Sequence, residues 1–257
     1  VGGGALLFAL PPTVPAVVGD ASADLVDLYR RVQSRDGALF ERGWALGAWW
    51  DALAPVVEAH AGALVHPFLD RPDADPDTVA ATTAAALDAL VDAVVASVPP
   101  AWSEVAQPLA ADLRALVPAK LGRMRAGERR RGARLPVADV WANVEGAVRA
   151  ALYTRIRTDH NADRGSRSAA QAARFLFLRE FAYASMFRFN RAGEFNVPYG
   201  GISYNRKSLT DRVAHLASDE VGARLAATDV HHGDFEDTLA AADLRPDDVV
   251  FLDPPYD

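Results

Sequence analysis

The sequence contains no cysteine, which excludes a disulfide framework, a thiolate zinc site and a cysteine nucleophile. We expect a cytoplasmic location, for which this absence is typical. Long uninterrupted apolar runs are also absent. The most apolar stretch, Ala80 to Val98, is broken by Thr82, Thr83, Asp88 and Asp92, so we expect no membrane partner. No signal peptide is visible, and because the sequence does not begin with Met we expect a preceding segment.

Basic residues are in the minority, with 27 Lys and Arg against 34 Asp and Glu and a formal net charge of −7. Residues 1–100 carry 5 basic and 13 acidic side chains, residues 101–191 carry 17 and 8, and residues 192–257 carry 5 and 13. A protein that binds a polyanion needs a local basic face rather than a basic average, so the middle of the chain is a candidate surface for phosphates. An Arg-rich solvated surface without a partner is the alternative.

Both ends of the chain show the alternation of strands and helices that is typical of an open α/β sheet. The β-branched run Val14–Gly19 predicts a buried strand, and apolar residues at helical spacing predict a helix over 22–35. Near the other end, Ala226–His231 and Val249–Leu252 predict strands on either side of a short helix at 235–242.

The middle of the chain is helical and rich in alanine. Residues 36–145 predict three or four helices punctuated by prolines, with the run Arg129–Arg131 in a loop. A loop or hairpin rich in Gly, Asn and Pro is expected at 193–206. Further helices are expected at 143–160, 168–189 and 206–218. The elements of a sheet therefore flank a helical, partly basic middle.

The tetrapeptide Asp253-Pro254-Pro255-Tyr256 directly follows the last expected strand, and ligands of open α/β sheets bind at the carboxyl ends of strands. A carboxylate and a backbone carbonyl that accept both hydrogens of an exocyclic amino group would localise its nitrogen lone pair. The prolines stiffen the loop and donate no N–H, and the tyrosine offers a ring on which a flipped base can stack. A turn in which two prolines merely end the strand is the alternative.

The run Gly2-Gly3-Gly4 lies where a strand would turn into a helix, so that backbone can approach a ligand closely. Asp20, at the end of the next strand, is placed to accept hydrogen bonds from ribose hydroxyls. Leu7 stands where a dinucleotide fingerprint has its third glycine, which disfavours that class of cofactor. A flexible start to the chain is the alternative for the glycines.

Asp234 and Phe235 follow the strand that ends near His231, where an acid and an aromatic ring could face an adenine. A helix N-cap at Asp234 is equally natural. His231 and His232 are neighbours in a strand and point to opposite faces, so no metal site is expected.

Together these residues resemble the Dam-like, or alpha-group, N6-adenine-specific DNA methyltransferases. Val1 to Ala5 is similar to the close of the family's cofactor motif, Asp20 to its ribose-binding acid, and Asp253 to Tyr256 to its catalytic motif. The most specific similarity is the run RFNRAGEFNVPYG, from Arg188 to Gly200, which in this family lies in the target-recognition region.

The resemblance implies an α/β fold, a Rossmann-like sheet that binds S-adenosylmethionine, with a helical target-recognition domain inserted. It implies transfer of a methyl group to the N6 amino group of adenine in duplex DNA, with base flipping and without a metal. The corresponding division is a catalytic domain at 1–35 and 219–257, a helical insertion at 36–145 and a target-recognition domain at 146–218.

Site roles follow from the same resemblance. The cofactor would be held by Gly2, Gly3, Gly4, Asp20, Asp234 and Phe235. The flipped adenine would be held and activated by Asp253, Pro254, Pro255 and Tyr256. DNA would be contacted by Tyr183, Arg188, Asn190, Asn196, Pro198, Tyr199 and Gly200, with Arg188 paired to a guanine edge. A core position in the 168–189 helix is the alternative for Tyr183.

Three features depart from the family. Ala184-Ser185 stands where the family usually has Asn-Gly, and Glu180 where it has a basic residue, so the GATC site cannot be assumed. The 36–145 insertion is longer than the family's compact connection. The chain begins and ends inside motifs, so we expect a piece of a longer protein.

Several readings of function stay open on the sequence. A cytosine-N4 or RNA methyltransferase would share the Asp-Pro-Pro-Tyr motif, although the 195–200 loop argues against both. A non-catalytic DNA-binding module on the same fold is a further alternative. A partner in restriction or phage defence fits the family.

Overall fold

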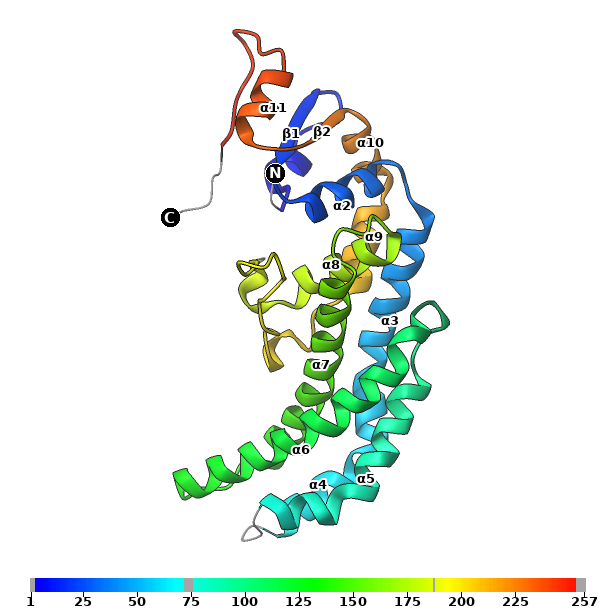
Figure 1. Ribbon diagram of the computed structural model, residues 1–257, viewed down its shortest axis with the longest axis vertical. Helices are drawn as coiled ribbons and strands as arrows, with labels where there is room; N and C mark the ends of the chain where they lie inside the picture. Colours follow the sequence, from blue (N-terminus) through cyan, green and yellow to red (C-terminus); the bar gives the residue numbers. More distant parts are fainter. Residues whose placement is uncertain (1–2, 72–75, 187, 253–257) are drawn as a thin grey trace.

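The computed structural model describes residues 3–71, 76–186 and 188–252. The molecule is elongated, with a small α/β lobe at one end and a long helical body extending from it (Figure 1). The lobe consists of α1 (Ala5–Ala9), β1 (Ala16–Asp20), α2 (Ala23–Gln33), α10 (Asp219–Ala226), β2 (Thr228–His232) and α11 (Phe235–Ala241). The helical body lies between α2 and α10 in the sequence.

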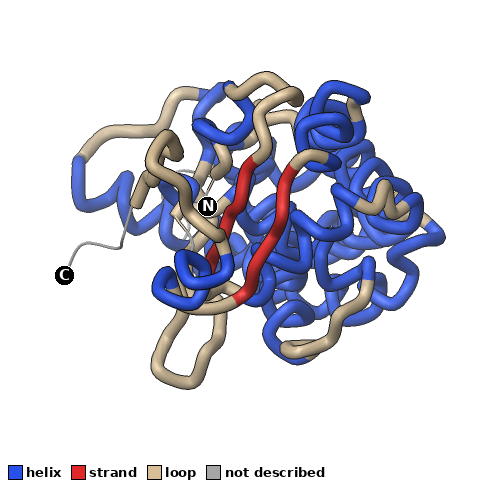
Figure 2. The backbone as a smooth tube through the Cα atoms, turned by 90° about the horizontal axis from the view of Figure 1, so that it is seen from above, coloured by secondary structure: helices blue, strands red, loops and turns tan. Residues whose placement is uncertain are grey.

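The two strands form a parallel pair, in register from Ala16 opposite Thr228 to Asp20 opposite His232. Figure 2 shows them side by side against the helices. α2 packs against both strands and α11 packs on β1. These elements confirm the strand at 14–19, the helix at 22–35, the strand at 226–231 and the helix at 235–242, each within a few residues. The burial expected for the first strand is wrong, since β1 has no fully buried residue and Val17 is 38% exposed. The described part of the chain has this two-stranded sheet and no larger one.

The strand expected at Val249–Leu252 is wrong. These residues have no strand pairing, and Val249, Phe251 and Leu252 are 93%, 67% and 53% exposed. A turn precedes them, in which the Asp248 N–H donates to the Arg245 carbonyl at 3.0 Å. A strand is stabilised by ladder hydrogen bonds and by burial of one face, and this run makes neither interaction with β1 or β2.

The helical body contains α3 (Gly37–His60), α4 (Gly62–Asp70), α5 (Pro76–Ala96), η1 (Pro100–Val105), α6 (Ala106–Arg131), α7 (Val137–Ala162), α8 (Ala169–Phe181), η2 (Tyr183–Ser185), η3 (Ile202–Tyr204) and α9 (Leu209–Ala217). Four α-helices between 36 and 131 confirm the three or four expected there. Helix α3 is central, since it packs against α5, α7, α8 and α9. Its Trp49, Trp50 and Leu53 are 2% exposed or less, so the hydrophobic effect attaches the other helices to it.

Within the described ranges, no single helix is long and apolar enough to span a membrane. The bent pair α3 and α4, which meet at 54°, would pass that test together by length and composition.

Three helix boundaries differ from expectation. The helix expected at 143–160 is α7, which begins earlier, at Val137 after Pro136. Arg129–Arg131 form the last turn of α6 rather than a loop, because arginine propagates a helix well and Gly132, at φ 63°, supplies the left-handed C-cap that ends it. Helix α8 ends at Phe181 rather than 189, because the chain beyond it pairs with Tyr199 and turns through η2. Helix α10 was not expected at all.

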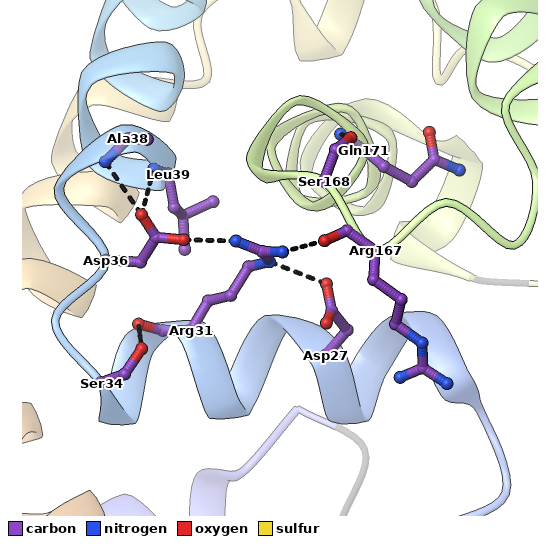
Figure 3. Close-up of polar contacts among 9 residues, drawn as sticks. All are labelled: Asp27, Arg31, Ser34, Asp36, Ala38, Leu39, Arg167, Ser168 and Gln171. Carbon is purple, nitrogen blue, oxygen red and sulfur yellow. Dashed lines mark hydrogen bonds and ion pairs between the residues drawn. The ribbon is translucent and has the colours of Figure 1, made fainter.

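The two parts of the molecule are joined through Arg31, near the end of α2 (Figure 3). Its guanidinium donates to the Asp27 carboxylate at 2.9 Å, and also to the Asp36 carboxylate and the Arg167 carbonyl. Asp36 in turn caps α3 by accepting from Ala38 and Leu39. Arg167 precedes Ser168, the N-cap of α8. One cation therefore fixes the end of α2 against the starts of α3 and α8.

Candidate functional site

The carboxyl edge of the sheet collects three of the residues predicted to bind the cofactor. Asp20 ends β1 opposite His232, which ends β2. The Gly233 N–H donates to the Asp20 carbonyl at 3.2 Å, so the turn carrying Asp234 and Phe235 starts beside Asp20. Carboxyl ends of parallel strands are where open α/β sheets bind ligands.

Each of the two acids at this edge also organises its own turn. The Asp20 carboxylate accepts from the Ser22 N–H at 2.8 Å, and Ser22 then caps α2. Asp234 is the N-cap of α11 and accepts from the Glu236 N–H at 3.1 Å, as the helix-cap alternative predicted. The ring of Phe235 is 55% exposed and could cover a flat ligand. Both roles of Asp234 are compatible, because a capping carboxylate has a second oxygen.

The glycine turn lies against α2. Gly4 has φ 74°, in the left-handed region, and a Cβ there would collide with the Tyr29 hydroxyl and the Phe8 ring. Only glycine fits both the conformation and the space. Gly3 is more open, since the Arg179 guanidinium lies 3.9 Å from its Cβ position. Gly2 is outside the described residues.

Residues 188–200, called the recognition hairpin after the role that the family resemblance implies, form a short hairpin. This confirms the loop or hairpin expected at 193–206 and extends it back to 188. Phe189 and Phe195 form an antiparallel bridge, and the Asn196 N–H donates to the Arg188 carbonyl at 3.1 Å. The Asn190 side chain shapes the tip by accepting from the N–H groups of Ala192 and Glu194, at 2.9 and 3.0 Å. Asn190 thus has a structural role in the hairpin itself.

Arg188 lies exposed on this hairpin. Its Nε donates to the Asn196 Oδ1 at 3.1 Å. A single side-chain acceptor thus orients the guanidinium, whose other donors lie at the outer end of the side chain. Arg188 and Asn196, both predicted to contact DNA, are brought together in this way.

A second pairing joins the hairpin to the end of α8. Ala182 and Tyr199 form an antiparallel bridge, Tyr183 N–H donates to the Pro198 carbonyl at 2.9 Å, and Gly200 N–H donates to the Phe181 carbonyl at 3.0 Å. Tyr183, Pro198 and Gly200 are therefore neighbours. Tyr183 is 56% exposed, so the core position considered for it is wrong.

Tyr199 points the other way. Its ring lies 5.8 Å from Trp50 and 5.6 Å from Tyr153, between centroids, and its hydroxyl donates to Asn205 Oδ1 at 2.5 Å. Burial raises the pKa of Tyr199 above its usual range. This tyrosine anchors the loop to the core.

Helix α7 holds the hairpin through residues that the sequence analysis missed. The Asn161 side chain accepts from the Phe195 N–H at 2.8 Å and donates to the Phe195 carbonyl at 3.1 Å. Tyr153 Oη and Arg157 both donate to the Val197 carbonyl, at 2.9 and 3.1 Å. The spacing of four residues puts the three side chains on one face of α7. The interval of four residues between polar side chains is the sequence signal by which they could have been identified.

The turn between α8 and the hairpin is strained. Ala184 has φ 54° and Ser185 has φ 51°, both in the left-handed region. That conformation costs about 1–2 kcal/mol for a residue with a Cβ. Asparagine and glycine adopt it readily, so the backbone keeps the shape for which the family's Asn-Gly is suited, although the two residues differ.

The predicted catalytic residues Asp253, Pro254, Pro255 and Tyr256 lie outside the described residues. The described chain leading to them, 249–252, follows α11 and is exposed.

Comparison with known proteins covers both the hairpin at 188–200 and the tetrapeptide Asp253–Tyr256. Residues 142–257 match the family model of the D12 class N6 adenine-specific DNA methyltransferase. The retron Ec67 DNA adenine methylase of Escherichia coli is 32% identical over 114 residues, which is 44% of this chain and 37% of the relative. The type II methyltransferase M.MjaIII of Methanocaldococcus jannaschii is 30% identical over 119 residues, 46% of this chain and 39% of the relative.

A third relative is the DNA N-6-adenine-methyltransferase of Escherichia phage P1, 36% identical over 87 residues, 34% of this chain and 10% of the relative. The chain spans less than two fifths of the length of these curated relatives. No solved structure matches. Over residues 142–257, this chain is therefore similar to the D12 class N6 adenine-specific DNA methyltransferases.

Proposed function

We propose that the protein to which this chain belongs transfers a methyl group from S-adenosylmethionine to the N6 amino group of adenine in duplex DNA, at a specific site. One observation carries the proposal: the family match runs unbroken from α7 through the recognition hairpin to the Asp253–Tyr256 tetrapeptide. It therefore includes both a segment suited to reading DNA and a segment suited to activating an amine.

The described residues fit the cofactor. The carboxylate of Asp20 at the carboxyl edge of the sheet would accept from the ribose hydroxyls, and Phe235 would lie against the adenine. Backbone at the exposed Gly3 could approach a ligand closely, whereas Gly4 is buried against Tyr29 and Phe8 and shapes the turn. S-adenosylmethionine would supply the methyl group. A Rossmann-like sheet, extended beyond β1 and β2, is part of this proposal.

On the DNA side, the exposed Arg188 would pair with a guanine edge, and the exposed Tyr183 would lie beside the displaced base. Pro198, Asn196 and Gly200 would form the surface that meets the duplex. The flipped adenine would donate its two amino hydrogens to Asp253 and a carbonyl of the proline pair, with Tyr256 stacked on the ring. Asn190 and Tyr199 would contribute by holding this surface in shape.

The proposed division keeps a catalytic part at 1–35 and 219–257, a helical insertion at 36–145 and a recognition part at 146–218, with α7 running through the boundary between 145 and 146. A partner in restriction or phage defence is proposed on the names of the relatives alone.

The test uses the full-length protein, labelled S-adenosylmethionine and duplex DNA, with the methylated nucleosides identified by mass spectrometry. We expect N6-methyladenine, and a loss of about a hundredfold or more for Asp253→Ala with the cofactor still bound, because a transition-state contact is removed. N4-methylcytosine, methylation of RNA alone, or DNA binding without methylation would each contradict the proposal in favour of one alternative.

A second arm tests the cofactor site. Asp20→Asn keeps an oxygen that can accept from Ser22 and so preserves the turn, but it removes the charge. Binding of S-adenosylmethionine should weaken by about 1.5–3 kcal/mol, the range for a hydrogen bond to a charged group. Unchanged affinity in calorimetry would leave Asp20 as a turn residue.

A further inference from the structure

A cavity of about 470 Å³ lies between α1, α2, α8, α9 and α10, on the side of the glycine turn that faces the helical body. Its wall is apolar where α2, α8 and α10 contribute Leu28, Leu176 and Leu225. Its charged lining comes from Arg179 and Glu180 on α8 and from Asp211 and Arg212 on α9.

The cavity is next to the proposed cofactor residues. The Tyr29 hydroxyl, which lines it, touches the space where a Cβ of Gly4 would be. Arg179 lies 3.9 Å from the Cβ position of Gly3. Asp20 is close enough to act electrostatically on both Tyr29 and Arg179. A ligand held by Asp20 and the glycine turn therefore has the cavity within reach.

The charges in the cavity favour an anion. Burial lowers the pKa of Arg179, and although Tyr29, Asp20 and Glu180 act against this, the Arg212 charge lowers it further. A guanidinium stays protonated in a protein, and two of them line this cavity, so an anion there would meet donors of opposite charge from both α8 and α9. The Glu180 carboxylate is 3.7 Å from the Lys207 ammonium, which already offsets its charge. Asp211 also lines the cavity, in the exposed first turn of α9.

We propose that Arg179 and Arg212 bind the carboxylate of the amino-acid end of S-adenosylmethionine in this cavity. The inference rests on the proposed function, and it assigns a cofactor contact to the helix that leads into the recognition hairpin. A guanidinium pairs with a carboxylate through two parallel hydrogen bonds, which gives both affinity and direction. The apolar wall suits the methylene groups between that carboxylate and the sulfur.

The experiment compares S-adenosylmethionine with its decarboxylated form, which lacks only this carboxylate, by calorimetry on the full-length protein. The wild type should prefer S-adenosylmethionine by roughly ten- to a hundredfold, the equivalent of a hydrogen bond to a charged group. In Arg179→Met that preference should collapse toward one, because S-adenosylmethionine loses affinity and the decarboxylated form does not. Arg179→Lys should restore part of it.

Arg206→Met, at an exposed position outside the cavity lining, is the matched control and should keep the wild-type preference. Arg212→Met is a second variant, on a shorter helix, should Arg179→Met fail to fold by circular dichroism. If both arginine variants fold and keep the wild-type preference, or lose both ligands equally, the carboxylate site is wrong. A loss confined to DNA binding would assign the two arginines to phosphates and also overturn it.

Failure of the proposed function would give a different result from failure of the carboxylate site. A wild-type protein that binds neither form of the cofactor contradicts both proposals. A wild type that methylates adenine but shows no preference between the two cofactor forms contradicts the carboxylate site alone.

Discussion

The side chain of Asn161 pairs with the backbone of Phe195 as a neighbouring β-strand would, accepting from its N–H and donating to its carbonyl. The recognition hairpin is thereby fixed to α7, a helix of 26 residues, rather than standing alone. An isolated two-stranded hairpin is at best marginally stable in water. The geometry of the candidate DNA surface thus depends on a helix that need not touch DNA.

Asn161→Ala should impair DNA discrimination more than cofactor binding. Loss of the amide leaves the Phe195 N–H and carbonyl without these partners, at a cost of about 1–3 kcal/mol, and lets the hairpin move. We expect a reduced preference for the cognate site, measured on a randomised duplex library, with unchanged affinity for S-adenosylmethionine. Asn143→Ala, at a half-buried position near the start of the same helix, is the control. Equal effects of the two substitutions would show that α7 does not position the hairpin.

Ser185→Gly should stabilise the protein by about 1 kcal/mol. Glycine relieves the left-handed strain at φ 51°, which outweighs its greater backbone entropy and the absence of the hydrogen bond that the Ser185 hydroxyl accepts from Lys207 at 3.3 Å. Denaturant unfolding measures the change. Ser103→Gly, an exposed position in η1 without a positive φ, should be destabilising instead. Destabilisation at both positions would mean that the turn is not strained.

Arg188→Ala should relax specificity at one position of the recognition site. A side chain paired with guanine carries about 1–3 kcal/mol of discrimination. Methylation of a randomised-site duplex library is the measurement, and Arg191→Ala, exposed on the same hairpin, is the matched control. A wild-type sequence preference in Arg188→Ala would show that another residue reads the base.

Replacement of Arg129, Arg130 and Arg131 together by alanine should weaken binding to all duplexes alike. These side chains are exposed in the last turn of α6, where pairing with a phosphate would add affinity without sequence preference. The salt dependence of binding should flatten by up to about 0.9 for each phosphate that the variant no longer neutralises. Binding equal to wild type at two salt concentrations would remove this end of α6 from the DNA surface.

Arg31→Met should destabilise the protein by about 1.5–3 kcal/mol, because hydrogen bonds to two carboxylates and a carbonyl are removed at the junction of α2, α3 and α8. Thermal or denaturant unfolding measures the effect. Arg114→Met breaks an exposed ion pair with Asp88, which typically contributes less than about 1 kcal/mol. A similar small effect at both positions would show that the junction does not depend on Arg31.

Features that depend on neighbours in sequence could be predicted. The helix over 22–35 follows from the spacing of Leu25, Leu28 and Val32, and its cap from Ser22. The turn of the hairpin follows from two residues. The Asn190 side chain accepts from the backbone of the tip, and Gly193 adopts a φ of 73°. These signals are local, so sequence alone contains them.

Features that depend on partners distant in the sequence could not be predicted. The 249–252 run is as apolar and β-branched as β1, and only the absence of strand pairing in the folded chain separates them. The Arg179 guanidinium and Gly3 are close only because α8 packs against α2. The loop predicted at Arg129 to Arg131 is wrong for a local reason, because Gly132 after them marks the end of the helix.

The Arg30 guanidinium reaches the Val230 carbonyl at 2.9 Å, across 200 residues of sequence. On the ribosome, β1 and α2 emerge well before β2, so the pair of strands cannot form until β2 has been synthesised. Helices α5, α6 and α7, by contrast, contact their sequence neighbours and can fold as they appear. The helical body is therefore expected to form before β1 pairs with β2 and to bring the two strands together, so that the edge of the sheet at Asp20 is completed only after the helices.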